Sequence, residues 1–273
     1  MTKRLHLHLL SDSTGETLEV VAKAGLAHFE GVEGIKHFWP MIRSEGHLDR
    51  VLQEIAQRPG LVLFTLANPQ HRRRLETQCH ALGLPVVAIL DPVIDSLSRL
   101  LGQEAKVKPG LQHVLDSAYF ARVEAIQFTI AHDDGLSPDD WEEADIVLVG
   151  VSRSSKTPTS IYLANRGYKV ANVPLVSEQI PPALSTLTKP LVVGLTTHLD
   201  RLIQVRRNRL LSLSQRPDTD YVDPEAVASE IARARRLFAD NGWPVIDVTR
   251  RSIEETAAAV MNLVQERLEA REA

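Results

Sequence analysis

Short apolar runs alternate with amphipathic stretches along most of this chain. In the first half, apolar runs bounded by turn-forming residues predict strands, and apolar residues at helical spacing predict helices. The predicted strands are residues 5–10, 35–43, 61–66 and 85–90, and the predicted helices are residues 18–29, 48–56 and 69–81. Strands and helices that alternate at these lengths predict a parallel sheet covered by helices. Pro40 lies in the second strand and places it at a sheet edge, because proline cannot donate a ladder hydrogen bond.

The same pattern returns in the second half. The predicted strands are residues 144–149, 168–176, 191–195 and 244–248, and the predicted helices are residues 159–164, 200–212 and 224–241. Residues 215–223 form a polar loop, and Ser252 and Glu255 have the spacing of a capping box before a C-terminal helix. The fold class is therefore α/β: an N-terminal parallel-sheet, Rossmann-like domain and a C-terminal domain that the phosphate-binding loop at residues 150–157 makes P-loop kinase-like.

A helix predicted over residues 119–132 ends in the acidic sequence His-Asp-Asp-Gly at 132–135. The dipole at a helix C-terminus disfavours negative charge, so two carboxylates there are unusual. A plain loop explains them as well as a role in chemistry or in Mg²⁺ binding. We divide the chain at this point, into domains 1–135 and 136–273.

A phosphate-binding motif follows the strand at 144–149. It consists of Gly150, Val151, Ser152, Arg153, Ser154, Ser155, Lys156 and Thr157. A strand, a glycine, five residues and then Lys-Thr opening a helix is the layout of a P-loop, in which backbone N–H groups surround an anion and lysine adds positive charge. Thr157 is the expected Mg²⁺ ligand. Ser155 replaces the usual second glycine, so this position must accept a Cβ and cannot have a backbone conformation open only to glycine.

A second loop of similar character follows the first predicted strand, at residues 11–17 (Ser-Asp-Ser-Thr-Gly-Glu-Thr). Its amides and hydroxyls are suited to a phosphate, although a simple helix cap by Ser13 or Thr14 explains it too. In the preceding strand His6 and His8 point to one face, where a polar sheet surface is a better explanation than a metal site.

Composition narrows the class of protein. The formal net charge of −4 gives no indication of binding to nucleic acid or to an anionic membrane. No apolar stretch approaches the ~20 residues that span a bilayer, and the N-terminus does not have the pattern of a signal peptide. The single cysteine, Cys79, excludes an intrachain disulfide. We expect a cytoplasmic protein.

The helix predicted over 200–212 carries several arginines, namely Arg201, Arg206, Arg207 and Arg209. Arginines in a lid would neutralise charge on a transferred phosphoryl group, and Arg206 and Arg207 are the candidates. A solvated helix face explains them equally well. Asp247 ends the last predicted strand and is better explained as a turn residue than as a Mg²⁺ ligand.

Three classes of function remain open from these residues: a phosphotransferase acting on a small metabolite, one acting on a protein, and a nucleotide sensor without catalysis. A GTPase is disfavoured because the chain contains no Asn-Lys-x-Asp motif. The large region before the P-loop favours the protein substrate, since a compact metabolite kinase needs little more than a single domain.

The motifs together resemble one family, the regulatory proteins of pyruvate, phosphate dikinase and of phosphoenolpyruvate synthase. The resemblance rests on residues 11–17, 131–135, 150–160 and 171–176, and it extends nearly end to end. In this family, serine in place of the second glycine, as at Ser155, is a form in which the loop occurs.

The resemblance implies a bifunctional enzyme with ADP bound at residues 150–157. One activity is an ADP-dependent serine/threonine kinase that inactivates the dikinase by phosphorylating a threonine. The other is a phosphorylase that uses inorganic phosphate to remove the group and releases pyrophosphate. In this scheme Lys156 neutralises the transferring group, and Asp133 or Asp134 takes the threonine proton.

The Ser-Ser-Lys-Thr form of the loop favours the dikinase over phosphoenolpyruvate synthase as target. An ATP-dependent small-metabolite kinase is the alternative from another class. The expected partner is a protein substrate, with neither nucleic acid nor membrane, and a homodimer is left open.

Overall fold

The computed structural model describes residues 3–105, 117–175, 181–213 and 219–272. Val176 and residues 215–218, on which parts of two predictions fall, lie outside the described residues. The chain forms two compact units, Met1–Val114 and Leu115–Ala273. Each unit contains one four-stranded parallel sheet, as the α/β pattern predicts.

The first unit has the strand order β2-β1-β3-β4. Its elements are β1 (Lys3–Ser11), α1 (Glu16–Leu26), β2 (Val32–Trp39), α2 (Glu45–Gln57), β3 (Leu61–Thr65), α3 (Pro69–Ala81), β4 (Val86–Ala88) and α4 (Asp91–Leu101). The strand that precedes Pro40 is an edge strand, as predicted, and it ends one residue before the proline.

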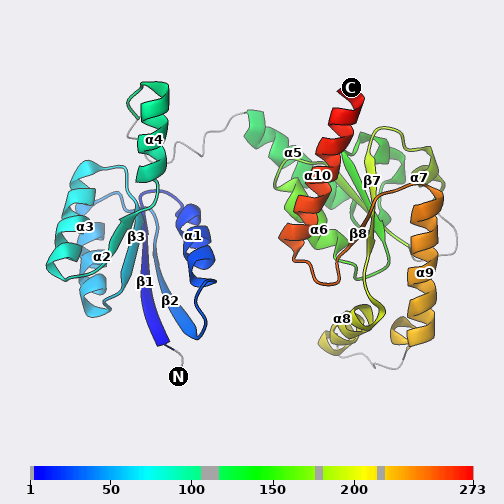
Figure 1. The fold of residues 1–273 in the computed structure, drawn as a ribbon, viewed down its shortest axis with the longest axis horizontal. Coiled ribbons are helices and arrows are strands. Elements are labelled where there is room, and N and C mark those ends of the chain that lie inside the picture. Colours follow the sequence, from blue (N-terminus) through cyan, green and yellow to red (C-terminus); the bar gives the residue numbers. More distant parts are fainter. Residues whose placement is uncertain (1–2, 106–116, 176–180, 214–218, 273) are drawn as a thin grey trace. The chain divides into compact units, whose positions relative to one another are not determined.

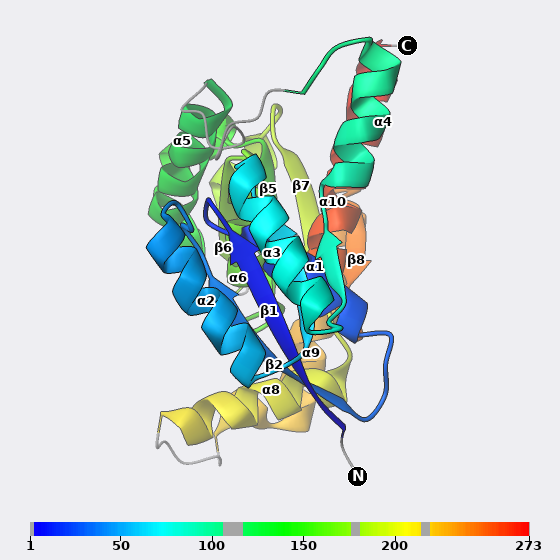
Figure 2. The ribbon, with the colours of Figure 1, turned by 90° about the vertical axis from the view of Figure 1, so that its left-hand side faces the viewer.

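Helices cover both faces of this sheet (Figures 1 and 2). Helices α2 and α3 pack on one face, where Val51 and Leu75 join Phe64 in a buried cluster. Helix α1 packs on the other face, where Leu18 joins Leu9. The alternation of side chains along β1 and β3 thus supplies two hydrophobic cores, one on each side.

Histidines lie side by side on β1 and β2. The rings of His6 and His8 both stack on His37, and Trp39 donates a hydrogen bond to Nδ1 of His8 over 3.3 Å. Burial lowers the pKa of His8 from its ordinary value, which favours the neutral ring. The shared face predicted for His6 and His8 is a stacked aromatic surface.

The second unit has the strand order β6-β5-β7-β8. Its strands are β5 (Ile146–Gly150), β6 (Val170–Pro174), β7 (Leu191–Thr196) and β8 (Val245–Asp247). Its α-helices are α5 (Ser117–Ala131), α6 (Lys156–Ala164), α7 (Pro182–Thr186), α8 (Leu199–Ser212), α9 (Pro224–Asp240) and α10 (Ile253–Glu272), and its short 3₁₀ helices are η2 (Asp133–Gly135), η3 (Pro138–Glu143) and η4 (Asp220–Val222).

Two cores lie on opposite faces of this second sheet. Helices α8 and α9 bury Leu202 and Phe238 with Val149 on one face, and α6 and α10 bury Leu163 and Val260 on the other (Figure 1). The predicted capping box begins α10, since the Ser252 amide donates to the Glu255 carboxylate and the Glu255 amide donates to the Ser252 hydroxyl. All four strands run parallel, so the loops that follow them meet at one edge.

Helix α5 belongs by its contacts to the second unit. It packs on α6 and β6, and the segment Asp133–Gly135 that follows it also contacts β6. The compact units therefore divide between residues 114 and 115, whereas the sequence pattern places the division after residue 135. The reason is physical: helical spacing shows that α5 has an apolar face but not which sheet that face packs on.

Among the described residues, no helix is both long and apolar enough to cross a membrane.

Candidate phosphate-binding site

The loop between β5 and α6 is shaped by close backbone approach at its first residue. A Cβ on Gly150 would lie 2.6 Å from the carbonyl oxygen of Leu195 on the neighbouring strand, so only glycine fits. Ser155, the N-cap residue of α6, has φ 64° and ψ 17°. This left-handed region favours glycine but remains accessible to a residue with a Cβ, at a cost of about 1–2 kcal/mol. The loop therefore keeps a P-loop backbone without its second glycine.

Lys156 lies beneath this loop with its side chain folded back on it. The residue is 5% exposed, and its Nζ donates to the carbonyl oxygens of Gly150 over 2.9 Å and of Val151 over 3.0 Å. Burial lowers the Lys156 pKa to about 8, against the opposing effect of the nearby carboxylates Asp134 and Asp133. A buried ammonium group whose acceptors are neutral carbonyls is electrostatically suited to an anion.

The pKa of Lys156 predicts how anion binding depends on pH. A bound phosphate stabilises the protonated lysine and raises its pKa, so the complex holds more protons than the free protein above pH 8. Relative to Lys156→Arg, affinity for pyrophosphate should fall by up to about tenfold per pH unit above the free-state pKa of Lys156. Isothermal titration calorimetry between pH 6.5 and 9.5 measures this. Lys156→Arg is the matched control, because arginine stays protonated and its profile reports only the ionisation of the ligand; equal profiles for the two proteins would contradict the assignment.

Thr157, the next residue, is part of a polar cluster with oxygen ligands suited to Mg²⁺. Its Oγ1 donates to Oδ1 of Asp133 over 3.1 Å, and Asn172 Nδ2 donates to Thr157 Oγ1 over 2.8 Å and also to Asp133. A hydroxyl and a carboxylate fit a magnesium ion that takes its other ligands from water and phosphate. Among the described residues no group of three or more His, Cys, Asp or Glu gathers that would suit a metal held by such side chains alone.

The acidic segment at 132–135 meets the P-loop through β6. The backbone amide of Asn172 donates to the backbone carbonyl of His132 over 3.0 Å. His132 itself is buried, stacks on Phe128 and bonds the carbonyl of the same residue through Nδ1 over 2.7 Å. Asp134 is exposed, in the left-handed region with φ 55°. The structure thus brings Asp133 to Thr157 and leaves the Asp134 carboxylate open to solvent near Lys156.

Arg206 reaches the P-loop from the opposite side, but as a buried support. It is 1% exposed and lies over the ring of Tyr221. Its guanidinium donates to both carboxylate oxygens of Glu230, the shorter bond being 2.6 Å, and to the carbonyl of Ser152 over 3.3 Å. This arrangement fixes the loop backbone to α8 and α9, and the burial of Arg206 differs from the solvated helix face that the sequence left open beside the lid.

The other residues predicted from the sequence lie away from the cluster of Thr157 and Asp133, or support the loop through Tyr221. Arg207 is exposed on α8, and Arg153, in the loop itself, bonds the hydroxyl of Tyr221 over 3.4 Å. Asp247 accepts the amide of Thr249 over 2.8 Å, which is the geometry of a turn aspartate.

The loop after β1 in the first unit is held by its own hydrogen bonds. Asp12 accepts the amide of Ala67 over 2.5 Å, and Ser11 accepts the hydroxyl of Thr65 over 3.0 Å. Helix α1 begins after Gly15, its N-cap residue, so Ser13 and Thr14 precede the N-cap position.

Asn172, Glu230 and Tyr221 contribute to the site although sequence reasoning assigned them no role. Asn172 had a detectable signal, since it is a polar residue inside a buried strand. Glu230 and Tyr221 had none, because Tyr221 hydrogen-bonds Ser152 and Arg153, and Glu230 pairs with Arg206, only across long sequence separations.

The parallel sheet, the glycine at the end of β5 and the buried lysine at the start of α6 define an α/β protein with a loop of P-loop type. Comparison with protein families identifies the family. The chain belongs to the kinase/pyrophosphorylase family, whose model matches residues 7–261.

Relatives match over almost their whole length. A protein of Rhizorhabdus wittichii is 75% identical over 97% of each chain, and one of Sphingopyxis alaskensis is 68% identical over 98% of this chain and 99% of its own. One of Rhodopseudomonas palustris is 53% identical over 96% of this chain and 95% of its own. All three carry the name "Putative pyruvate, phosphate dikinase regulatory protein". The family supports a phosphotransferase with a regulatory role, as the resemblance implied.

Proposed function

We propose that this protein reversibly phosphorylates a threonine of pyruvate, phosphate dikinase, with ADP as donor and inorganic phosphate as acceptor in the reverse direction. The names of the relatives support the dikinase as target. The observation that carries the proposal is the buried Lys156 ammonium group at the P-loop, beside the cluster of Thr157 and Asp133.

The chemistry balances in both directions. In the kinase direction the threonine oxygen bonds to the β-phosphorus of ADP, the bond from that phosphorus to its bridging oxygen breaks, AMP leaves and the threonine proton passes to a base. In the reverse direction an oxygen of hydrogen phosphate bonds to the phosphothreonine phosphorus, and the bond from that phosphorus to the threonine oxygen breaks. The proton of the hydrogen phosphate passes to the threonine oxygen, so that pyrophosphate and the free threonine are released. Both are transfers to an oxygen nucleophile in line, which need positioning and charge neutralisation more than covalent chemistry from the protein.

The residues of the site divide this work between them. Lys156 neutralises charge on the transferring phosphoryl group, and the loop amides hold its oxygens. Thr157 and Asp133 would hold Mg²⁺, which would supply positive charge to the phosphate oxygens. Because Asp133 is engaged with Thr157 and Asn172, we assign the role of base to Asp134, whose carboxylate is exposed.

This division predicts different effects for the two aspartates. Asp134→Asn should lower ADP-dependent phosphorylation by about 10²-fold, because the threonine hydroxyl loses its proton acceptor. It should lower phosphorolysis much less, because inorganic phosphate is already an anion. Asp133→Asn should lower both by similar factors, because it disturbs the position of Thr157. Initial rates in each direction measure this.

Asp139→Asn is the matched control, since Asp139 is an exposed aspartate in η3, away from the P-loop contacts. It should leave both rates within twofold. Equal losses in both directions for Asp134→Asn would contradict its role as base.

The target is tested by incubating the purified protein with ADP and either the dikinase or phosphoenolpyruvate synthase, followed by mass spectrometry of the target. We expect phosphothreonine on the dikinase and AMP in equal amount. Modification of the synthase alone would transfer the same chemistry to the other target, and modification of neither would oppose a protein substrate.

A further inference from the structure

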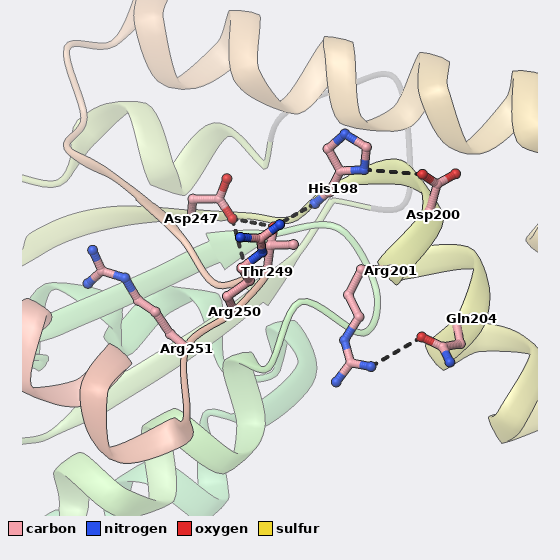
Figure 3. Close-up of a pocket in the computed structure, with 8 residues that line it drawn as sticks. All are labelled: His198, Asp200, Arg201, Gln204, Asp247, Thr249, Arg250 and Arg251. Atoms are coloured by element: carbon pink, nitrogen blue, oxygen red, sulfur yellow. Dashed lines mark hydrogen bonds and ion pairs between the residues drawn. The ribbon is translucent and has the colours of Figure 1, made fainter.

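A second polar pocket lies at the same sheet edge as the P-loop. It has a volume of about 860 Å³, within the range of small-molecule sites. Its walls come from the start of α8, with His198, Asp200 and Arg201, and from the end of β8 and the segment after it, with Asp247 and Arg250 (Figure 3). All of these residues belong to the second unit, and the catalytic scheme above uses none of them.

The strand register fixes the distance from this pocket to the P-loop. Gly150 pairs with Leu195 on β7, and Leu195 pairs with Ile246 on β8. Two strand spacings therefore separate the start of the P-loop from the end of β8, or about 10 Å. Helix α8 also connects the two places, because its first turn lines the pocket and Arg206, further along, bonds the Ser152 carbonyl. A nucleotide whose phosphates lie in the P-loop can reach across β7 with its ribose and base.

The walls are fixed by hydrogen bonds on the β8 side. The Thr249 hydroxyl accepts the amide of His198 over 2.8 Å and donates to Asp247, which links the two segments. Burial opposes ionisation of Asp247, but the bonds from Thr249 outweigh it and its pKa lies below the ordinary value. Asp247 therefore presents a charged carboxylate to the pocket.

The mixture of charges distinguishes between possible ligands. Guanidinium groups such as those of Arg201 and Arg250 stack on planar rings, and nucleobases have planar rings. Carboxylates such as those of Asp200 and Asp247 accept hydrogen bonds from hydroxyl or amino groups, and they repel phosphate. Planar cations together with carboxylates therefore suit a base and a ribose better than a second phosphate group.

We propose that this pocket binds the nucleoside part of the nucleoside diphosphate whose phosphates occupy the P-loop. The inference rests on the proposed function for the phosphate position and adds the site of the base and ribose. In open α/β sheets ligands bind beyond the carboxyl ends of the strands, which is where β5, β7 and β8 bring the two sites together.

Two probes separate the nucleoside site from the phosphate site: ADP, and pyrophosphate, which has no nucleoside. Arg201→Ala and Arg250→Ala should each weaken ADP binding about tenfold in calorimetry, equivalent to about 1.4 kcal/mol, and leave pyrophosphate binding unchanged. Both side chains are exposed, so the fold should be retained, which circular dichroism checks. Arg250→Lys should weaken ADP similarly, because lysine keeps the charge but not the planar group.

Arg209→Ala is the matched control. Arg209 is an exposed arginine on the same helix and does not line the pocket, so this variant should bind both probes as before. Undiminished ADP affinity in the pocket variants would overturn the proposal. An equal loss for pyrophosphate would also overturn it, because the arginines would then act on phosphate. If the unmodified protein binds pyrophosphate and ADP equally, the pocket proposal fails alone; if it binds neither, the proposed function fails as well.

Discussion

Lys156→Ala should lower the rates of both transfers by about 10²–10³-fold, which is the effect of losing a group that stabilises transition-state charge. The reason is the position of its Nζ, which is buried beneath the loop within hydrogen-bond distance of the Gly150 and Val151 carbonyls. Affinity for ADP and for pyrophosphate should fall together, since both place a phosphate in the same loop. Initial rates in each direction and calorimetry with each ligand measure the effect.

Lys36→Ala is the matched control, because Lys36 is an exposed lysine on β2 of the first unit. It changes the net charge equally and should leave binding and rates within twofold. Full turnover and unchanged ADP affinity in Lys156→Ala would show that the P-loop does not bind the phosphates of ADP.

Arg206→Met should destabilise the second unit by about 3 kcal/mol, the lower end of the cost of breaking a buried ion pair. It leaves Glu230, which is partly buried, without its cation, and it removes the donor to the Ser152 carbonyl. Hydrogen-exchange mass spectrometry in increasing urea measures the stability of peptides from β5 to α9. Arg209→Met, on the exposed part of the same helix, should change stability by less than about 0.5 kcal/mol.

A double variant distinguishes the two roles of Arg206. Adding Glu230→Gln to Arg206→Met removes the unpaired carboxylate and should recover part of the lost stability. ADP affinity should stay low, because the Ser152 carbonyl still lacks its donor and the loop is held less firmly. Recovery of both stability and affinity would contradict a positioning role for Arg206.

Local sequence signals predicted most of the fold because each depends on neighbouring residues. The apolar run before Gly150 and the helix after Lys156 are where the pattern placed them, Pro40 follows an edge strand, and Ser252 begins a capping box. Strand, cap and edge signals are all short-range, so one sequence suffices to detect them.

The rest depends on which elements pack together, and one sequence does not determine that. The bond from Asn172 to Asp133 joins residues 39 positions apart, and the pair of Arg206 and Glu230 joins two helices. Arginine spacing indicated a helix rich in positive charge but not that one of its members is buried. The pocket beyond β7 and β8 arises from two loops that meet only because their strands are parallel neighbours.

Phosphoryl transfer from ADP to the dikinase is measured by incubating the protein with the dikinase and ADP labelled with ³²P at its β-phosphate. Label should appear on a threonine of the dikinase, unlabelled AMP should be released in equal amount, and Lys156→Ala should lower the rate of both by about 10²–10³-fold. Added phosphate should then release the label as pyrophosphate. If the label stays in ADP while a parallel incubation with ATP transfers the γ-phosphate to the dikinase, ADP is not the donor and the proposed function is wrong.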